Sequence, residues 1–314
     1  MSLKSAYVGK VYPITEPYLV GREKVREFAR AIGDHHPAYR DVSAARVYGL
    51  RDVLAPPTFP FIVTMQAMNK AMFDPEIGLD YARVVHGEQS FEYIRPLVAG
   101  DEVVVHASIE AIDSAGRNEF LTVRSDVRTV DGDPVVTTRS VLVSRGTGLG
   151  AQAAATAAGP RRDEPAPRPT IGLTQADAIA PVEPGTLLAV GDFPLRRPDL
   201  IRYCGASGDF NPIHWNERVA TAVGLPNVIA HGMLTMAQAG RAVTTYLNDP
   251  TWWESFSVRF TAPVVVPDDD EDVVVGVKIA LAELLPPRRA RLDLTATVDG
   301  VAVLGQAIAT ARVV

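Results

Sequence analysis

The sequence contains one cysteine, Cys204, among 314 residues. A single cysteine cannot form a disulfide within the chain and cannot build a zinc site from several thiolates. Lone cysteines usually behave as small apolar side chains, so we expect Cys204 to be buried and inert. The sequence also shows no credible third ligand near His214 and His231. We therefore expect no metal site.

Long apolar runs and excess positive charge are also absent. No stretch reaches the length of a membrane span, and residues 1–6 lack the apolar segment of a secretion signal. The net charge of −6 argues against a nucleic-acid partner bound through a broad basic field. A composition of 47% hydrophobic and 22% charged residues is ordinary for a globular protein with a sizeable core. We expect a cytoplasmic protein without a membrane span or a nucleic-acid partner.

The chain instead repeats itself. Residues 28–39 align with residues 203–214 after a shift of 175 positions, and a glycine, an aspartate and a proline coincide. This register continues to residue 55, and a register displaced by eight positions relates residues 90–96 to residues 257–263. An internal duplication explains both registers.

A linker separates the two copies. Residues 148–185 are rich in alanine, glycine and proline and lack the periodicity of a helix or a strand. A chain of this length has room for about two domains. We therefore predict one domain at residues 1–147 and a second at residues 186–314.

Each copy predicts the same order of elements. An amphipathic segment leads into a Gly-Asp turn, an apolar helix follows, and three β-branched strands come last. The predicted helices lie at residues 59–68 and 233–240, and both are apolar around most of their circumference, which indicates burial. The predicted strands are residues 101–109, 120–130, 135–144, 273–279, 291–298 and 301–313. The pattern predicts an α+β fold in which an antiparallel sheet wraps around a long central helix in each half, with the halves pairing as an intrachain pseudo-dimer.

The most specific chemical signal lies in the second copy. Asp209 and His214 place a carboxylate and an imidazole five residues apart, after a turn that Gly208 can supply. Further on, His231 and Gly232 begin a predicted helix. An isolated Asp and His at this spacing would more often be a turn residue and a core histidine. The combination predicts a proton-transfer site that faces a helix N-terminus.

The sequence segments around these residues resemble those of a known protein family. Residues 207–214, with the sequence SGDFNPIH, are similar to the signature of the MaoC-like hydratases and dehydratases, which adopt a hot-dog fold. Residues 85–91, VHGEQSF, lie in a first copy that resembles the non-catalytic dehydratase domain found beside MaoC domains. In two-subunit (3R)-hydroxyacyl-ACP dehydratases of type II fatty acid synthesis, these roles are divided between two polypeptides. This chain resembles a fused form with two hot-dog domains, and the resemblance covers nearly everything except the linker.

The resemblance implies reversible dehydration of (3R)-3-hydroxyacyl thioesters to trans-2-enoyl thioesters in fatty acid metabolism. It implies that Asp209 and His214 act as the acid–base pair and that the backbone N–H of Gly232 binds the thioester carbonyl. Asn211, which can hold the loop, and His231, which can pack beside the pair, complete the predicted substrate-binding part of the site. The resemblance implies an acyl-CoA or acyl carrier protein substrate and no cofactor of the protein's own.

The chemistry of such a reaction needs these groups. Loss of water requires removal of a weakly acidic C2 proton and protonation of the departing hydroxide, so two proton-transfer groups are needed. An imidazole works near neutral pH, and an amide N–H in the first turn of a helix can stabilise charge on the thioester oxygen. The sequence leaves open which of Asp209 and His214 acts at C2.

The first copy lacks the residues that form this predicted site in the second copy. Tyr39 stands where the second copy has His214, and a phenol with a pKa near 10 is a poor base. Pro56 and Pro57 replace His231 and Gly232, which removes the amide donors. We predict that the first domain is non-catalytic.

Two other functions stay open for the chain. It could be a non-catalytic acyl-thioester binding protein, or a hot-dog thioesterase with a different placement of acid and base. The acyl chain length and the choice between CoA and acyl carrier protein also stay open, and a monomeric pseudo-dimer and a homodimer are both compatible with the sequence.

Overall fold

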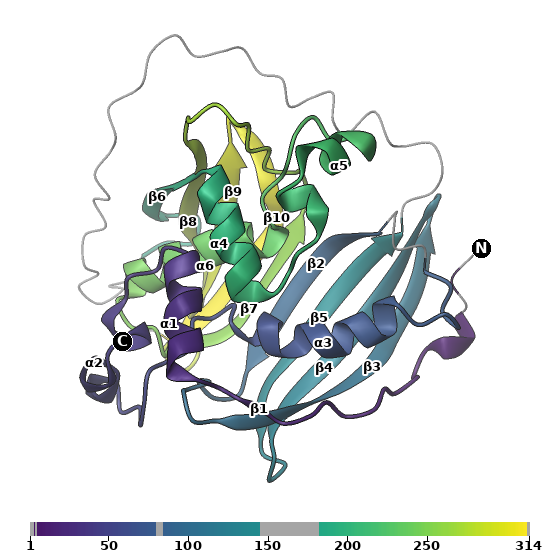
Figure 1. Cartoon of the computed structure of the whole chain (residues 1–314). Coiled ribbons are helices and arrows are strands. Elements are labelled where there is room, and N and C mark those ends of the chain that lie inside the picture. Colours follow the sequence, from purple (N-terminus) through teal and green to yellow (C-terminus); the bar gives the residue numbers. More distant parts are fainter. Residues whose placement is uncertain (1–2, 4, 80–83, 145–181, 313–314) are drawn as a thin grey trace. The chain divides into compact units, whose positions relative to one another are not determined.

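The computed structural model describes residue 3 and residues 5–79, 84–144 and 182–312 (Figure 1). Nearly all of the predicted linker therefore lies outside the described residues. The chain divides into two compact units, Met1–Thr147 with Pro250–Arg259, and Gly148–Asp249 with Phe260–Val314. None of the described helices has the length and apolar character needed to cross a bilayer.

The first unit contains an antiparallel sheet with the strand order β1-β3-β4-β5-β2-β7. Its helical elements are η1 (Ser5–Tyr7), α1 (Arg22–Ala31), η2 (Pro37–Tyr39), α2 (Val42–Val47) and α3 (Pro60–Met72). Its strands are β1 (Tyr18–Leu19), β2 (Val84–Tyr93), β3 (Glu102–Ala115), β4 (Asn118–Thr129), β5 (Pro134–Ser144) and β7 (Trp253–Phe260), whose last residue is assigned to the second unit.

Helix α3 lies across β3, β4 and β5 (Figure 1). Alternate residues of β3 are buried, among them Val103, Val105 and Ile109, because successive side chains of a strand point to opposite faces of the sheet. On the helix, Phe61 and Ala67 are among the residues that this packing buries. The predicted sheet around a buried central helix is confirmed in this unit.

The second unit repeats the arrangement with the strand order β10-β9-β8-β6. Its elements are β6 (Leu187–Leu195), α4 (Arg197–Ser207), η4 (Pro212–His214), α5 (Glu217–Ala222), α6 (Gly232–Leu247), β8 (Val273–Leu285), β9 (Arg289–Val298) and β10 (Val301–Arg312). Helix α6 packs on β6, β8 and β10. It extends seven residues beyond the predicted end at residue 240, because Ala242, Val243 and Leu247 continue its buried face.

The backbone hydrogen bonds of the two units repeat in the registers found in the sequence. Leu54 N–H donates to Ala38 O at 2.9 Å, and Ile229 N–H donates to Ile213 O at 3.2 Å, 175 positions further on. Isolated bridges join Leu54 to Val98 and Ile229 to Val265, which reproduces the second register. The duplication therefore extends to the local structure around the Gly-Asp turn of each copy.

Strands β2, β6 and β7 were not predicted. Their sequences are less enriched in β-branched residues, and Gly87 in β2 and Gly191 in β6 weaken the strand pattern. At Gly87 the neighbouring strand approaches closely, since an added Cβ would lie 2.5 Å from Val143 Cγ2. The glycine that weakens the pattern is therefore required for packing.

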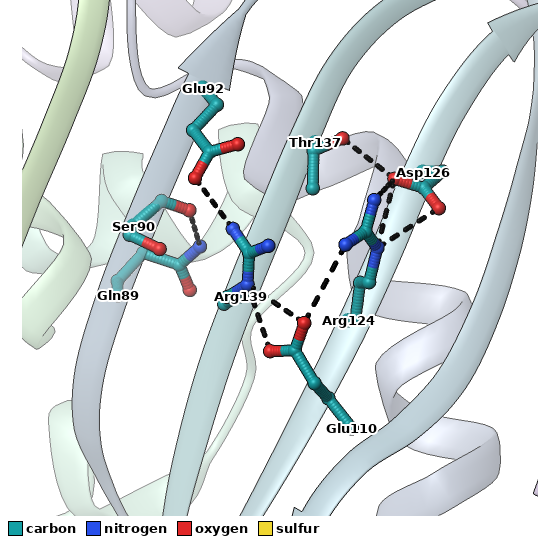
Figure 2. Close-up of polar contacts among 8 residues, drawn as sticks. All are labelled: Gln89, Ser90, Glu92, Glu110, Arg124, Asp126, Thr137 and Arg139. Atoms are coloured by element: carbon teal, nitrogen blue, oxygen red, sulfur yellow. Dashed lines mark hydrogen bonds and ion pairs between the residues drawn. The ribbon is translucent and has the colours of Figure 1, made fainter. Parts of the chain in front are cut away.

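The face of the first sheet shown in Figure 2 carries a network of charges. Arg124 on β4 and Arg139 on β5 are directly paired across the strands, which brings two like charges together. Glu110 lies at a register shift between Ile109 and Ala111 and accepts from Arg139 Nε at 2.8 Å. Its other carboxylate oxygen is 3.6 Å from Arg124 Nη1. Glu110 therefore screens the arginine pair.

Candidate active site

The loop that carries Asp209 begins where helix α4 ends. Gly208 takes the left-handed conformation at φ 79°, and its N–H donates to Cys204 O at 2.8 Å. A side chain at this position would be strained, so glycine ends the helix with little cost. Asp209 follows, with its N–H donating to Ser207 Oγ at 3.1 Å and its Oδ1 accepting from Asn211 N–H at 3.2 Å.

Asn211 and Pro212 then shape the short helix η4. The Asn211 side chain accepts from Ile213 N–H at 3.4 Å, and Pro212 occupies the first helical position. This turn places His214 in the interior, where the residue is 7% exposed. The Asn211 side chain therefore caps η4.

The hydrogen bond of His214 defines its tautomer. Its Nδ1 lies 2.8 Å from Ile229 O, and because a carbonyl oxygen can only accept, Nδ1 carries the proton. In the neutral imidazole, Nε2 then keeps its lone pair and can act as a base. Burial lowers the pKa of His214, with a smaller opposing effect from the charge of Asp209, so the neutral form prevails near pH 7.

His231 joins the site from the residue before helix α6. Its Nε2–H donates to the backbone oxygen of Asp209 at 3.1 Å, and its ring stacks on His214 with a centroid separation of 3.8 Å. Cys204 Sγ and the ring of Tyr203 pack on the same imidazole, at 3.5 Å from Nε2 and 4.8 Å between ring centroids. His231 therefore ties the Asp209 loop to the start of α6.

Three side chains converge as a result. One carboxylate oxygen of Asp209 and one ring nitrogen each of His214 and His231 all lie within 4.8 Å of one another. Within the described residues, no other group of three histidine, cysteine, aspartate or glutamate side chains is arranged in this way. The pKa of His231 is lowered by burial and by the neighbouring His214, so this imidazole is also neutral near pH 7.

Gly232 is the first residue of α6. The N–H groups in the first turn of a helix have no acceptor within the helix, and the helix dipole makes them favourable partners for negative charge. An added Cβ at Gly232 would lie 3.0 Å from two atoms of the Phe260 ring. The position therefore accommodates a small residue only.

In the first unit the corresponding turn is intact but the site is not. Asp34 Oδ1 accepts from His36 N–H at 3.0 Å, the same bond that Asp209 makes with Asn211. Tyr39, fully buried, stands in the place of His214. Pro57 has no N–H, and its carbonyl accepts from Tyr93 Oη at 2.6 Å.

The sequence did not reveal all of the neighbours of the site. Ile229, which fixes the tautomer of His214, contributes only a backbone oxygen, and any residue type could supply it. Phe260 aligns with Tyr93 in the second register, but its position beside Gly232 emerges only in the tertiary structure. Cys204 is buried as expected, and burial raises the pKa of its thiol to about 11.

Two family models match the chain. The first is described as a FAS1-like dehydratase domain region and matches residues 6–138, and the second, a MaoC-like domain, matches residues 179–278. The first half is also similar to a UPF0336 protein of Streptomyces griseus, with 51% identity over 145 residues that cover 46% of this chain and 97% of that protein.

Solved structures resemble the whole chain. A structure described as a MaoC-like dehydratase is 31% identical, with a TM-score of 0.84, and the match covers 98% of this chain and 99% of that one. A conserved hypothetical protein of Mycobacterium tuberculosis, described as having a double hot-dog fold, is 15% identical with a TM-score of 0.64, and the match covers 98% and 96% of the two chains. Both units of the present chain thus have the hot-dog fold.

Proposed function

Because the chain belongs to the MaoC-like dehydratase family, whose name indicates hydratase or dehydratase chemistry, we propose that it interconverts (3R)-3-hydroxyacyl thioesters and trans-2-enoyl thioesters. The observation that carries this proposal is the convergence of Asp209 with a neutral His214 whose Nε2 lone pair is available. A carboxylate and an imidazole at one place form the pair of proton-transfer groups that the reaction needs.

The proposed dehydration proceeds through a charged thioester oxygen. One member of the Asp209–His214 pair takes the proton from C2, and electron density moves onto the thioester oxygen. The C3–O bond then breaks as the hydroxyl receives a proton from the pair and leaves as water. In the reverse direction the same groups activate a water molecule, and the two roles are assigned to the pair jointly.

We assign stabilisation of the negative charge on the thioester oxygen to Gly232. Its backbone N–H sits in the first turn of α6, where it has no intrahelical acceptor and the helix dipole favours an anion. Donors that are already in place when charge develops contribute strongly to catalysis. Phe260, packed against Gly232, supports this position.

The remaining assignments extend this proposal. The first domain, residues 1–147, is assigned a non-catalytic role because Tyr39 and Pro57 replace the base and the amide donor. The domain of residues 186–314 carries the site, with residues 148–185 as the linker between them. The substrate is an acyl group on CoA or acyl carrier protein, and we place the protein in cytoplasmic fatty acid metabolism.

Incubation of the full chain with trans-2-butenoyl-CoA tests the function. Hydration removes the absorbance of the conjugated enoyl thioester without releasing a thiol, and a chiral assay should find the (3R)-hydroxy product. Release of free CoA to a thiol-trapping reagent would instead indicate a thioesterase. Binding without turnover would indicate the non-catalytic binding protein, and either outcome would refute the proposal.

A further inference from the structure

No metal site is expected from the sequence alone, because no third ligand is apparent near His214 and His231. In the folded chain Asp209 is a candidate for the third ligand, since it lies with His214 and His231 in a group whose donor atoms are all within 4.8 Å of one another. We propose that these three residues bind a divalent transition-metal ion, with Zn²⁺ the best fit, and that the bound ion reversibly inhibits the enzyme.

The donor set suits zinc. Zinc takes histidine nitrogens and carboxylate oxygens at roughly 2.0–2.2 Å, and sites with three protein ligands keep a position open for water or another small ligand. Ligands on one zinc ion lie roughly 3.3 Å apart at tetrahedral angles. The three donors must therefore close by at most about 1.5 Å to bind one ion.

Both imidazoles are already held in the way that metal-ligating histidines are held. Such histidines usually donate their second N–H to a backbone carbonyl or a carboxylate, which fixes the tautomer and the ring orientation. His214 Nδ1–H bonds Ile229 O at 2.8 Å, and His231 Nε2–H bonds Asp209 O at 3.1 Å. Each ring is left with one nitrogen that carries a lone pair.

In the proposed site, the metal ligand from His231 is its second nitrogen, Nδ1. His231 is 1% exposed, and its Nδ1 is buried without a hydrogen-bond partner among the described residues. A buried acceptor that lacks a partner costs stability, and a metal ion would satisfy it. The aspartate also brings a negative charge that partly neutralises a dication.

The inhibition is inferred from the atoms that the ion would bind. This part of the inference rests on the proposed function. A metal bound to His214 and Asp209 occupies the lone pairs that the proton transfers require. Substrate and ion then compete for the same groups, so the inhibition should weaken as the thioester concentration rises and should disappear when a chelator is added.

A metal titration of the full chain, previously treated with a chelator, tests binding without relying on turnover. Co²⁺ serves as the spectroscopic probe, and we expect one equivalent to give the ligand-field absorption of a low-coordinate site and to be displaced by Zn²⁺. The Asp209→Asn and His231→Gln variants should each weaken Co²⁺ binding at least tenfold, because loss of an outer partner alone typically costs about 10–100-fold.

The control is His35→Ala, which removes an exposed histidine next to His36 in the first unit and should leave the Co²⁺ affinity unchanged. Unchanged affinity in both site variants, or loss of binding in His35→Ala, would show adventitious surface binding and overturn the proposal. Folding of each variant is checked by circular dichroism.

In parallel, Zn²⁺ should inhibit hydration of trans-2-butenoyl-CoA and EDTA should restore it. Site binding without inhibition would refute the inhibitory claim, whereas no turnover in metal-free buffer would refute the proposed function and leave the metal site standing.

Discussion

The rings of His214 and His231 lie stacked, with centroids 3.8 Å apart and planes 26° from parallel. Protonation of both would place two positive charges in a buried contact, which is unfavourable on account of both desolvation and repulsion. Burial lowers the pKa of both groups, and the neighbouring His214 lowers the pKa of His231 further. The fold therefore keeps two neutral imidazoles beside Asp209 at neutral pH.

This pairing predicts a loss of stability in mild acid. The folded pKa of each imidazole lies below its unfolded value of 6.5, so below that pH the unfolded chain binds more protons than the folded one. The free energy of unfolding should therefore be fully retained above about pH 7 and should fall as the pH drops through 6.5. Urea unfolding at about pH 7.5 and 5.5 measures the loss, which should be smaller in His231→Gln. An equal loss in the variant would contradict the assignment.

The same shift predicts the pH dependence of activity. The base must be neutral, and burial lowers the pKa of His214 below 6.5. The acidic limb of kcat/KM should therefore lie below about pH 6.5, the value for an exposed imidazole. A pH–rate profile for the free enzyme checks this, and an acidic limb centred above 7 would show that His214 is not the group that titrates.

The duplication provides a matched control for Asp209. Asp34 and Asp209 make the same hydrogen bond to a backbone N–H two residues on, but the turn after Asp209 ends in His214 whereas the turn after Asp34 ends in Tyr39. Asp209→Asn should lower kcat by about 10²–10⁴-fold, whereas Asp34→Asn should change it less than about twofold. Equal losses in the two variants would point to a structural role for both aspartates.

The sequence was sufficient to predict the duplication and the Asp209–His214 pair. Both depend on local spacing: the turn at Gly208 and the short helix before His214 are encoded within a few residues, and the same register recurs at Gly33. Hydrophobic periodicity similarly located α3 and α6. Local signals of this kind persist in the folded chain because the backbone around them has few alternatives.

Longer-range relationships could not be predicted. The stacking of His214 on His231 and the bridge that joins Ile229 to Val265 both bring together residues distant in the sequence, and no local pattern encodes either contact. The convergence of Asp209 with both histidines is also long-range, since Asp209 and His231 are 22 residues apart in the sequence. The contact of Gly232 with Phe260 likewise required the tertiary structure.

Gly232→Ala tests the proposed oxyanion donor. The new Cβ would lie 3.0 Å from the Phe260 ring, so either the ring or the start of α6 must move. We expect kcat to fall by about 10²-fold, the loss typical of a disturbed oxyanion donor, with little change in the melting temperature. Addition of Phe260→Leu should relieve the clash and restore part of the activity. Wild-type kinetics in Gly232→Ala alone would exclude this amide from the mechanism.

Glu110→Gln tests the charge network of Figure 2. Without this carboxylate, Arg124 and Arg139 face each other across β4 and β5 with less compensation, so we expect a loss of about 0.5–1 kcal/mol in unfolding free energy. Glu92→Gln is the matched control, because Glu92 is 60% exposed and bonds only Arg139 in this network, and its loss should be smaller. Urea unfolding at low salt measures both, and equal effects would refute the screening role of Glu110.

Deuterium incorporation at C2 tests the central claim most directly. Hydration of trans-2-butenoyl-CoA in D₂O by the wild-type chain should give the (3R)-3-hydroxy thioester with a single deuterium at C2, delivered by the Asp209–His214 pair. Asp209→Asn and His214→Gln should each remain folded and form almost none of this product. Labelled (3R) product at near wild-type rates from both variants would contradict the account.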